Sequence, residues 1–219
     1  MLMQKEREAV VEYGKKLITS GLTKGTGGNV SVANRELKYF ALSPSGKDYF
    51  TITTEEVAII DFDGNIVEAK LKPSTEHELH RMILVDRLEI NAVIHAHTNY
   101  ATTLGCMRWD LPSLHYLVAL AGKNVRCAEY ATFGTKELAV NVVKAMENRF
   151  AAIMANHGVI AGGRDVANAF KKLEEVEYCC QLYWQAKAMG VEPVLLSDEE
   201  MEKHLVLFKT YGDAAVPKD

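Results

Sequence analysis

Three histidines, His95, His97 and His157, have the residue type and the spacing that suit the binding of a divalent metal ion. His95 and His97 lie two residues apart in the apolar segment 91–97, which we expect to form a strand. Side chains at positions i and i+2 of a strand point to the same face, so both imidazoles would reach one ion. Three imidazoles that leave one coordination position open are typical of catalytic zinc.

The sequence does not prove that these three histidines meet. His157 lies between two short apolar segments, and the turn at 156–158 would place it at a sheet edge. The alternative is that His95 and His97 are ordinary strand residues. The other histidines, His77, His80, His115 and His204, are expected to be polar helix or loop residues. Glu76 and His80, four positions apart, could also bind a metal as a pair, but a surface contact is the commoner explanation for such spacing.

Three further segments suit the binding of an anion. Segment 25–29 offers glycine N–H groups that no side chain covers, and segment 43–46 adds hydroxyls and another glycine. Segment 72–75 places hydroxyls at the expected start of a helix, where the helix dipole favours a phosphate. Each signal alone is weak, because such segments are more often only turns or caps. Glu76 follows directly, either as a dipole-favoured carboxylate or as a general base beside metal and phosphate.

Alternating helices and short strands must position these groups, which indicates an α/β or α+β class with helices packed on a central sheet. The periodicity predicts helices over 4–20, 73–88, 99–106, 113–121, 134–149 and 165–189, and a weakly helical segment over 197–211. It predicts strands over 29–33, 37–42, 57–61, 66–69, 91–97, 124–129, 151–155 and 158–161.

The composition is that of one medium-sized globular domain. The chain has 219 residues, 48% of them hydrophobic, and a formal net charge of −4, which gives no reason to expect nucleic acid or a membrane as partner. No cysteine pair has C-x-x-C spacing, and the N-terminus has no apolar signal region, so we expect reduced thiols and a cytoplasmic location. We expect a single domain over 1–212 and a disordered tail over 213–219.

Taken together, the motifs resemble the zinc-dependent class II aldolase/epimerase family over residues 5–190. They are G-T-G-G-N-V-S (25–31), S-P-S-G (43–46), K-P-S-T-E (72–76), V-I-H-A-H (93–97), H-Y (115–116), Y-A-T-F-G-T (130–135) and N-H-G (156–158). Single motifs are not specific, whereas the combination in this order is.

The resemblance implies a largely antiparallel central sheet flanked by helices, and a homotetramer with active sites between subunits. It assigns one zinc ion per subunit to His95, His97 and His157, with Glu76 as acid/base and additional ligand. Tyr116 matches a tyrosine that a neighbouring subunit contributes to catalysis. The resemblance also assigns two larger sets: a phosphate site of Gly28, Asn29, Ser45, Gly46, Ser74 and Thr75, and an aldehyde pocket of Phe133 and, loosely aligned, Tyr211.

The activity that the resemblance implies is retro-aldol cleavage of a ketose 1-phosphate to dihydroxyacetone phosphate and an aldehyde. L-Fuculose 1-phosphate, which yields L-lactaldehyde, is the favoured substrate. Alternatives are an aldolase for 5-deoxypentulose 1-phosphates, ribulose-5-phosphate 4-epimerase, which has an aspartate where Glu76 stands, and methylthioribulose-1-phosphate dehydratase. A non-enzymatic binding module of the adducin-head type lacks the zinc histidines and is therefore disfavoured.

Overall fold

A mixed sheet of eight strands forms the centre of the molecule in the computed structural model, which describes residues 1–210. The strands follow the order β4-β3-β2-β1-β5-β8-β7-β6, and every neighbouring pair is antiparallel except β6 with β7. The largely antiparallel sheet expected from the sequence is confirmed. The strands are β1 (Asn29–Asn34), β2 (Tyr39–Leu42), β3 (Ala58–Asp61), β4 (Ile66–Glu68), β5 (Ala92–Ala96), β6 (Cys127–Ala128), β7 (Ala151–Met154) and β8 (Gly158–Gly163).

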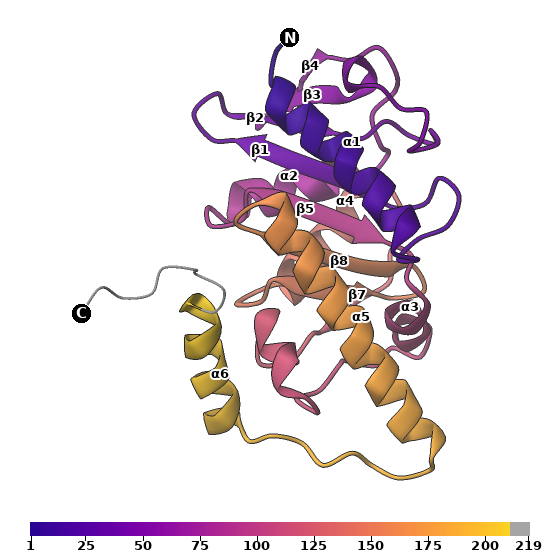
Figure 1. Cartoon of the computed structure of the whole chain (residues 1–219), viewed down its shortest axis with the longest axis vertical. Coiled ribbons are helices and arrows are strands. Elements are labelled where there is room, and N and C mark those ends of the chain that lie inside the picture. The colour runs from indigo at the N-terminus through magenta and orange to yellow at the C-terminus, as the bar shows by residue number, and fades with distance from the viewer. Residues whose placement is uncertain (211–219) are drawn as a thin grey trace, which may run out of the picture.

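Helices cover both faces of this sheet, as Figure 1 shows. Helices α1, α3 and α5 pack on one face, and α2 and α4 pack together on the other. The α-helices are α1 (Gln4–Thr19), α2 (His77–Asp86), α3 (Asn99–Cys106), α4 (Lys136–Ala145), α5 (Val166–Ala188) and α6 (Asp198–Thr210), and the 3₁₀ helices are η1 (Thr54–Glu56) and η2 (Tyr116–Leu120). Among residues 1–210, no helix has both the length and the apolar character needed to cross a membrane.

Side chains along the central strands alternate between two separate apolar cores. In β5, Ile94 belongs to the core beneath α1 and α5, whereas Val93 belongs to the core beneath α2 and α4. His95 therefore points to the same side as Val93, because side chains of a strand change face at each residue. Apart from His95, β5 is apolar throughout, as a strand covered on both faces requires.

Several predicted elements are shorter than the sequence pattern indicated. The helices expected over 73–88 and 134–149 form only over His77–Asp86 and Lys136–Ala145, and two other elements differ in character. The helix expected over 113–121 is only the 3₁₀ helix η2, because His115 is extended and its ring accepts a hydrogen bond from the N–H of Leu117. Gly122, with φ of 144°, follows the end of this helix. The strand expected over 124–129 pairs regularly only at β6, while Val125 forms an isolated bridge to Leu111. Tyr211 and the expected tail 213–219 lie outside the described residues.

His80 corrects an expectation, because it is not a surface residue. It lies on α2 and is fully buried, with its Nδ1 2.6 Å from the hydroxyl of Ser31 on β1. The helix places Leu79, Ile83 and Leu84 in the same apolar core, so the imidazole is carried inside with them. Burial lowers the pKa of His80 to about 3, and the ring is therefore neutral in the folded protein near pH 7.

The depressed pKa predicts acid sensitivity of the fold. The unfolded chain protonates His80 near the ordinary histidine value, whereas the folded chain does so only near pH 3, so the unfolded state binds more protons between them. We therefore expect the free energy of unfolding of the metal-free protein to fall as pH is lowered from 6.5 towards 4, by up to about 1.4 kcal/mol per pH unit for this group. Urea titrations of chelator-treated protein at several pH values measure this free energy. H80Q should show a shallower decline, and parallel profiles for the two proteins would contradict this assignment.

Candidate metal and phosphate site

The three histidines singled out in the sequence meet where the central strands end. His95 is the fourth residue of β5, His97 follows that strand, and His157 lies in the turn between β7 and β8. The sequence had suggested a position at a sheet edge, whereas this turn joins the ends of two inner strands. Asn156, with φ of 51°, makes the turn tight, and β8 begins at Gly158 directly after His157.

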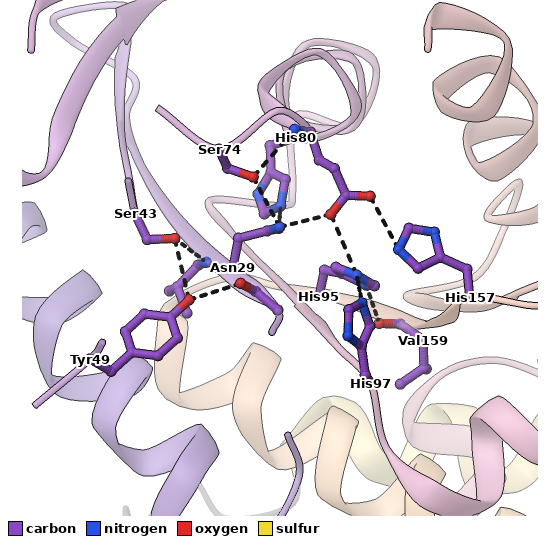
Figure 2. A network of polar contacts seen from close by, with 12 residues as sticks. Asn29, Ser43, Tyr49, Ser74, His80, His95, His97, His157 and Val159 are labelled. Carbon is purple, nitrogen blue, oxygen red and sulfur yellow. Dashed lines mark hydrogen bonds and ion pairs between the residues drawn. The ribbon is translucent and has the colours of Figure 1, made fainter. Parts of the chain in front are cut away.

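The imidazole nitrogens are close enough to share one ion. The Nε2 atoms of His95 and His97 are 3.0 Å apart, and one nitrogen from each of the three rings lies within 4.8 Å of the others. Figure 2 shows the three rings converging. Ligand nitrogens around a tetrahedral zinc are roughly 3.3 Å apart for metal–nitrogen bonds of about 2.05 Å. Within residues 1–210, this is the group of three candidate ligands that could hold a metal.

Backbone contacts fix the ligand atom of His95. Its Nδ1 donates to the carbonyl of Val159 over 3.0 Å, which leaves the lone pair of Nε2 directed towards the other histidines. Burial lowers the pKa of His95 to about 4 and also lowers the pKa of His97, so both rings are neutral, as metal binding requires. Gly158 allows the close packing, because a Cβ there would lie 2.4 Å from the carbonyl oxygen of Ala96.

Glu76 completes the donor set. It is 6% exposed and lies at the N-cap position of α2. The sequence had placed it inside the first turn of a helix that opens at Pro73, whereas the helix begins only at His77. Its Oε2 is 3.4 Å from Nε2 of His95, and its Oε1 is 3.5 Å from Nε2 of His157 and has no hydrogen-bond partner among the described residues. A buried carboxylate oxygen without a hydrogen-bond partner beside imidazole nitrogens is what a divalent cation would satisfy.

The ionised form of Glu76 is favoured. Burial raises the pKa of this carboxyl, but His95, His157 and a hydrogen bond from Asn29 together outweigh it and hold the pKa below its usual value. The Nδ2 group of Asn29 donates to Oε2 over 2.8 Å and also to the hydroxyl of Ser74 over 3.1 Å. The sequence placed Asn29 in the phosphate site, whereas its side-chain amide is engaged with Glu76 and Ser74.

A cavity of about 370 Å³ opens beside these side chains and is lined by residues of all three segments that the sequence suggested for an anion. The segments are tied together, because the N–H of Ser45 donates to the carbonyl of Lys72 and the N–H of Ser74 donates to that of Ser43. Ser45 therefore offers its hydroxyl rather than its N–H. The lining residues are Thr26, Gly27, Gly28, Asn29, Pro44, Ser45, Gly46, Ser74, Thr75, Glu76, His97, Phe133 and His157, with no lysine or arginine among them.

Ser74 presents a hydrogen-bond donor to this cavity. Its Oγ accepts from Asn29 and, over 3.2 Å, from the N–H of Glu76, which occupies both lone pairs and leaves its O–H to donate elsewhere. Gly28, with φ of 75°, brings the backbone close to β5, because a Cβ there would lie 2.6 Å from the carbonyl oxygen of His95. Hydroxyl and N–H donors without fixed charges are a common environment for a bound phosphate.

Tyr116 does not line the cavity of its own chain. It lies on η2, is 45% exposed, and stacks on Phe208 of α6 with ring centroids 6.1 Å apart. Phe133 does line the cavity and is 65% exposed. Thr26, Gly27 and Pro44 were not singled out individually, although they lie within the predicted segments. His80 was missed because nothing in its spacing distinguishes it from a surface residue.

Comparisons with known proteins agree with this arrangement. Residues 8–184 match the family model described as Class II Aldolase and Adducin N-terminal domain. A Bacillus thuringiensis protein named 5-deoxy-D-ribulose 1-phosphate aldolase is 50% identical over 97% of this chain and 99% of its own. An Escherichia coli K12 protein named L-fuculose phosphate aldolase is 37% identical over 93% of this chain and 94% of its own. A solved structure named L-fuculose 1-phosphate aldolase is 51% identical, covers 95% of this chain and 98% of its own, and has a TM-score of 0.93.

The match spans most of the sequence, and the family is metal-dependent, in agreement with the converging histidines and the buried carboxylate. Two observations separate the chain from the binding-module alternative: all three histidines are present, and the relatives of this chain are named as aldolases. The chain therefore belongs to the class II aldolase family and is an aldolase, a carbon–carbon lyase.

Proposed function

We propose that the protein cleaves a ketose 1-phosphate by a retro-aldol reaction, giving dihydroxyacetone phosphate and an aldehyde. The observation that carries the proposal is the meeting of three imidazoles and a buried carboxylate beside a cavity whose lining offers hydroxyl and N–H groups to a phosphate. When the C3–C4 bond breaks, the C4 hydroxyl loses its proton and C4 becomes the aldehyde carbon. The electron pair of the bond stays on C3, which must then take up a proton. The site therefore needs charge stabilisation and a proton carrier.

We propose zinc as the metal, one per subunit, held by His95, His97 and His157. The nitrogen donors and the carboxylate suit zinc, and an ion held there supplies Lewis-acid stabilisation to the oxygens of the substrate. His95 contributes its Nε2 because Nδ1 is engaged with Val159. Glu76 has two tasks in this proposal: it ligates the ion before the substrate enters and carries the proton at C3 afterwards.

The phosphate would sit among the backbone of Gly28 and Gly46 and the hydroxyls of Ser45, Ser74 and Thr75, which line one wall of the cavity. Asn29 contributes to this wall through its position, while its amide holds Glu76. Anchoring the phosphate fixes the distance between C3 and the carboxylate, which is the main advantage that binding gives to a proton transfer.

Tyr116 would act in a neighbouring subunit of a homotetramer, by assisting the removal of the C4 hydroxyl proton. Its exposure and its absence from the cavity of its own chain support this assignment. Phe133, exposed at the cavity, would face the aldehyde part of the substrate. Two expectations stay predictions from the sequence: that Tyr211 contributes to this aldehyde pocket, and that the protein is cytoplasmic.

Two substrates lead the candidates, and they share the dihydroxyacetone phosphate half. The resemblance in the sequence favoured L-fuculose 1-phosphate, and a solved structure at 51% identity carries that name. The curated relative at 50% identity is named for 5-deoxy-D-ribulose 1-phosphate, which would yield acetaldehyde instead of lactaldehyde. We place 5-deoxyribulose 1-phosphate first, because the curated relative named for fuculose phosphate is more distant, at 37%.

A substrate panel tests the proposal. Purified, zinc-loaded protein is incubated with the 1-phosphates of 5-deoxyribulose, 5-deoxyxylulose, fuculose and rhamnulose, and with ribulose 5-phosphate and methylthioribulose 1-phosphate. We expect release of dihydroxyacetone phosphate, with the highest kcat/KM for 5-deoxyribulose 1-phosphate. A higher value for fuculose 1-phosphate would change the substrate and leave the mechanism intact. Epimerisation or dehydration without release of dihydroxyacetone phosphate would refute it.

Glu76→Gln tests the proton carrier. Glutamine keeps the size and one oxygen ligand but cannot exchange a proton, so we expect kcat to fall about 10²–10⁴-fold while most of the zinc is retained. Turnover assays and metal analysis measure the two effects. Glu78→Gln is the matched control, because Glu78 lies two residues further on, pairs with Arg81 and does not line the cavity. Unchanged turnover in E76Q would contradict the assignment.

Tyr116→Phe tests the proposed contribution across subunits. Phenylalanine keeps the stacking on Phe208 and removes only the hydroxyl, so kcat should fall about 10²-fold while binding of dihydroxyacetone phosphate changes little. Calorimetry and turnover assays separate the two. Tyr130→Phe serves as control, since Tyr130 is exposed and lies outside the cavity lining. Equal losses of binding and turnover in Y116F would indicate a structural role.

A further inference from the structure

A continuous line of buried polar side chains leads from β1 to Glu76. The hydroxyl of Ser31 is 2.6 Å from Nδ1 of His80, and Nε2 of His80 contacts Oδ1 of Asn29. Asn29 in turn donates to Glu76 and Ser74. Ser31 and His80 are fully buried, and Asn29 is 5% exposed. Figure 2 shows His80 and Asn29 side by side beneath Ser74.

The direction of every hydrogen bond in this line follows from its end at the carboxylate. An ionised Glu76 can only accept, so Asn29 must turn its NH₂ group towards it and its Oδ1 towards His80. Oδ1 can only accept, so Nε2 of His80 must carry the proton. Nδ1 is then an acceptor, and the hydroxyl of Ser31 must donate to it. Each group has one orientation that satisfies its neighbour.

The backbone fixes both ends of the line. Asn29 and Ser31 lie two residues apart on β1 and face the same side, and Asn29 is paired with His95 of β5. Glu76 and His80 lie one helical turn apart, joined by the hydrogen bond from the N–H of His80 to the carbonyl of Glu76. The amide of Asn29 is therefore clasped between two side chains of one helical turn.

The geometry points to His80 as a positioning residue for the reaction: its Nε2–H locks the amide of Asn29, and that amide holds Oε2 of Glu76. The second oxygen, Oε1, is thereby left without a hydrogen-bond partner and directed towards His157, free for the ion or for a proton. A reversed amide would bring its oxygen against the carboxylate, which is repulsive. This inference rests on the proposed function where it concerns turnover, and on the contacts alone where it concerns the tautomer.

Other evidence supports a neutral ring with one proton. His80 is fully buried, and burial lowers its pKa to about 3. Groups that support metal ligands from behind change metal affinity or activity by about 10–100-fold when they are removed. His80 does not line the cavity. A loss of turnover of this size on its removal would therefore act through Asn29, which makes His80 a positioning residue rather than a catalytic one.

Two substitutions of His80 provide the test. His80→Gln places an amide nitrogen near the position of Nε2 and can still donate to Asn29, whereas His80→Met fills the space without a donor. We expect kcat of H80M to fall about 10–100-fold with KM changed less than about threefold, and H80Q to recover most of the loss. Zinc content and thermal unfolding are measured on both variants. Equal impairment of the two variants, or unchanged turnover in H80M, would overturn the inference.

A second measurement does not depend on activity or on the folding of H80M and H80Q. Long-range ¹H–¹⁵N NMR of the zinc-loaded wild-type protein at pH 7 reports which ring nitrogen of His80 is protonated, assigned by comparison with His80→Asn. We expect the Nε2–H tautomer. The Nδ1–H tautomer or an imidazolium would refute the proposed direction of the hydrogen bonds between His80 and Asn29. If no substrate of the panel is cleaved, the proposed function fails, while the tautomer still decides whether His80 locks Asn29.

Discussion

The pairing of β1 with β5 and of β5 with β8 is the constraint on which the site depends. It sets Asn29 opposite His95, and it brings the turn that carries His157 to the same end of the sheet. A slip of one residue would rotate His95 to the face covered by α1 and α5, away from Glu76. The register is secure because both faces of these strands are buried in apolar cores.

The cavity beside Glu76 offers no cationic side chain to a bound phosphate. The cavity has no lysine or arginine in its lining, so the negative charges of Glu76 and of the substrate depend on neutral donors and on the ion that the histidines can hold. Packing favours both the neutral form of His95 and His97 and the ionised form of Glu76, since burial lowers the pKa of these two histidines while Asn29 donates a hydrogen bond to the carboxylate.

The sequence predicted those parts of the site that local spacing determines. His95 and His97 follow from the period of a strand, and the cavity segments follow from glycines, hydroxyls and a helix start. Longer-range facts could not be predicted. His80 looks like a surface residue until the packing of α2 is known, and Asn29 could not be separated from phosphate ligands before its amide was placed. The helix expected over 113–121 was wrong because the side chain of His115 ends the regular pattern.

The exposure of Phe133 contrasts with the interlocked burial of Asn29, Ser74 and Glu76. A substitution on the buried side disturbs several partners at once, whereas a residue at the open rim can change at little cost to the fold. Under the proposed function, the part of the substrate that is common to many sugar phosphates is read by the least mutable part of the molecule. Divergence towards new acceptor aldehydes, natural or engineered in the direction of synthesis, would then have its easiest route through the rim.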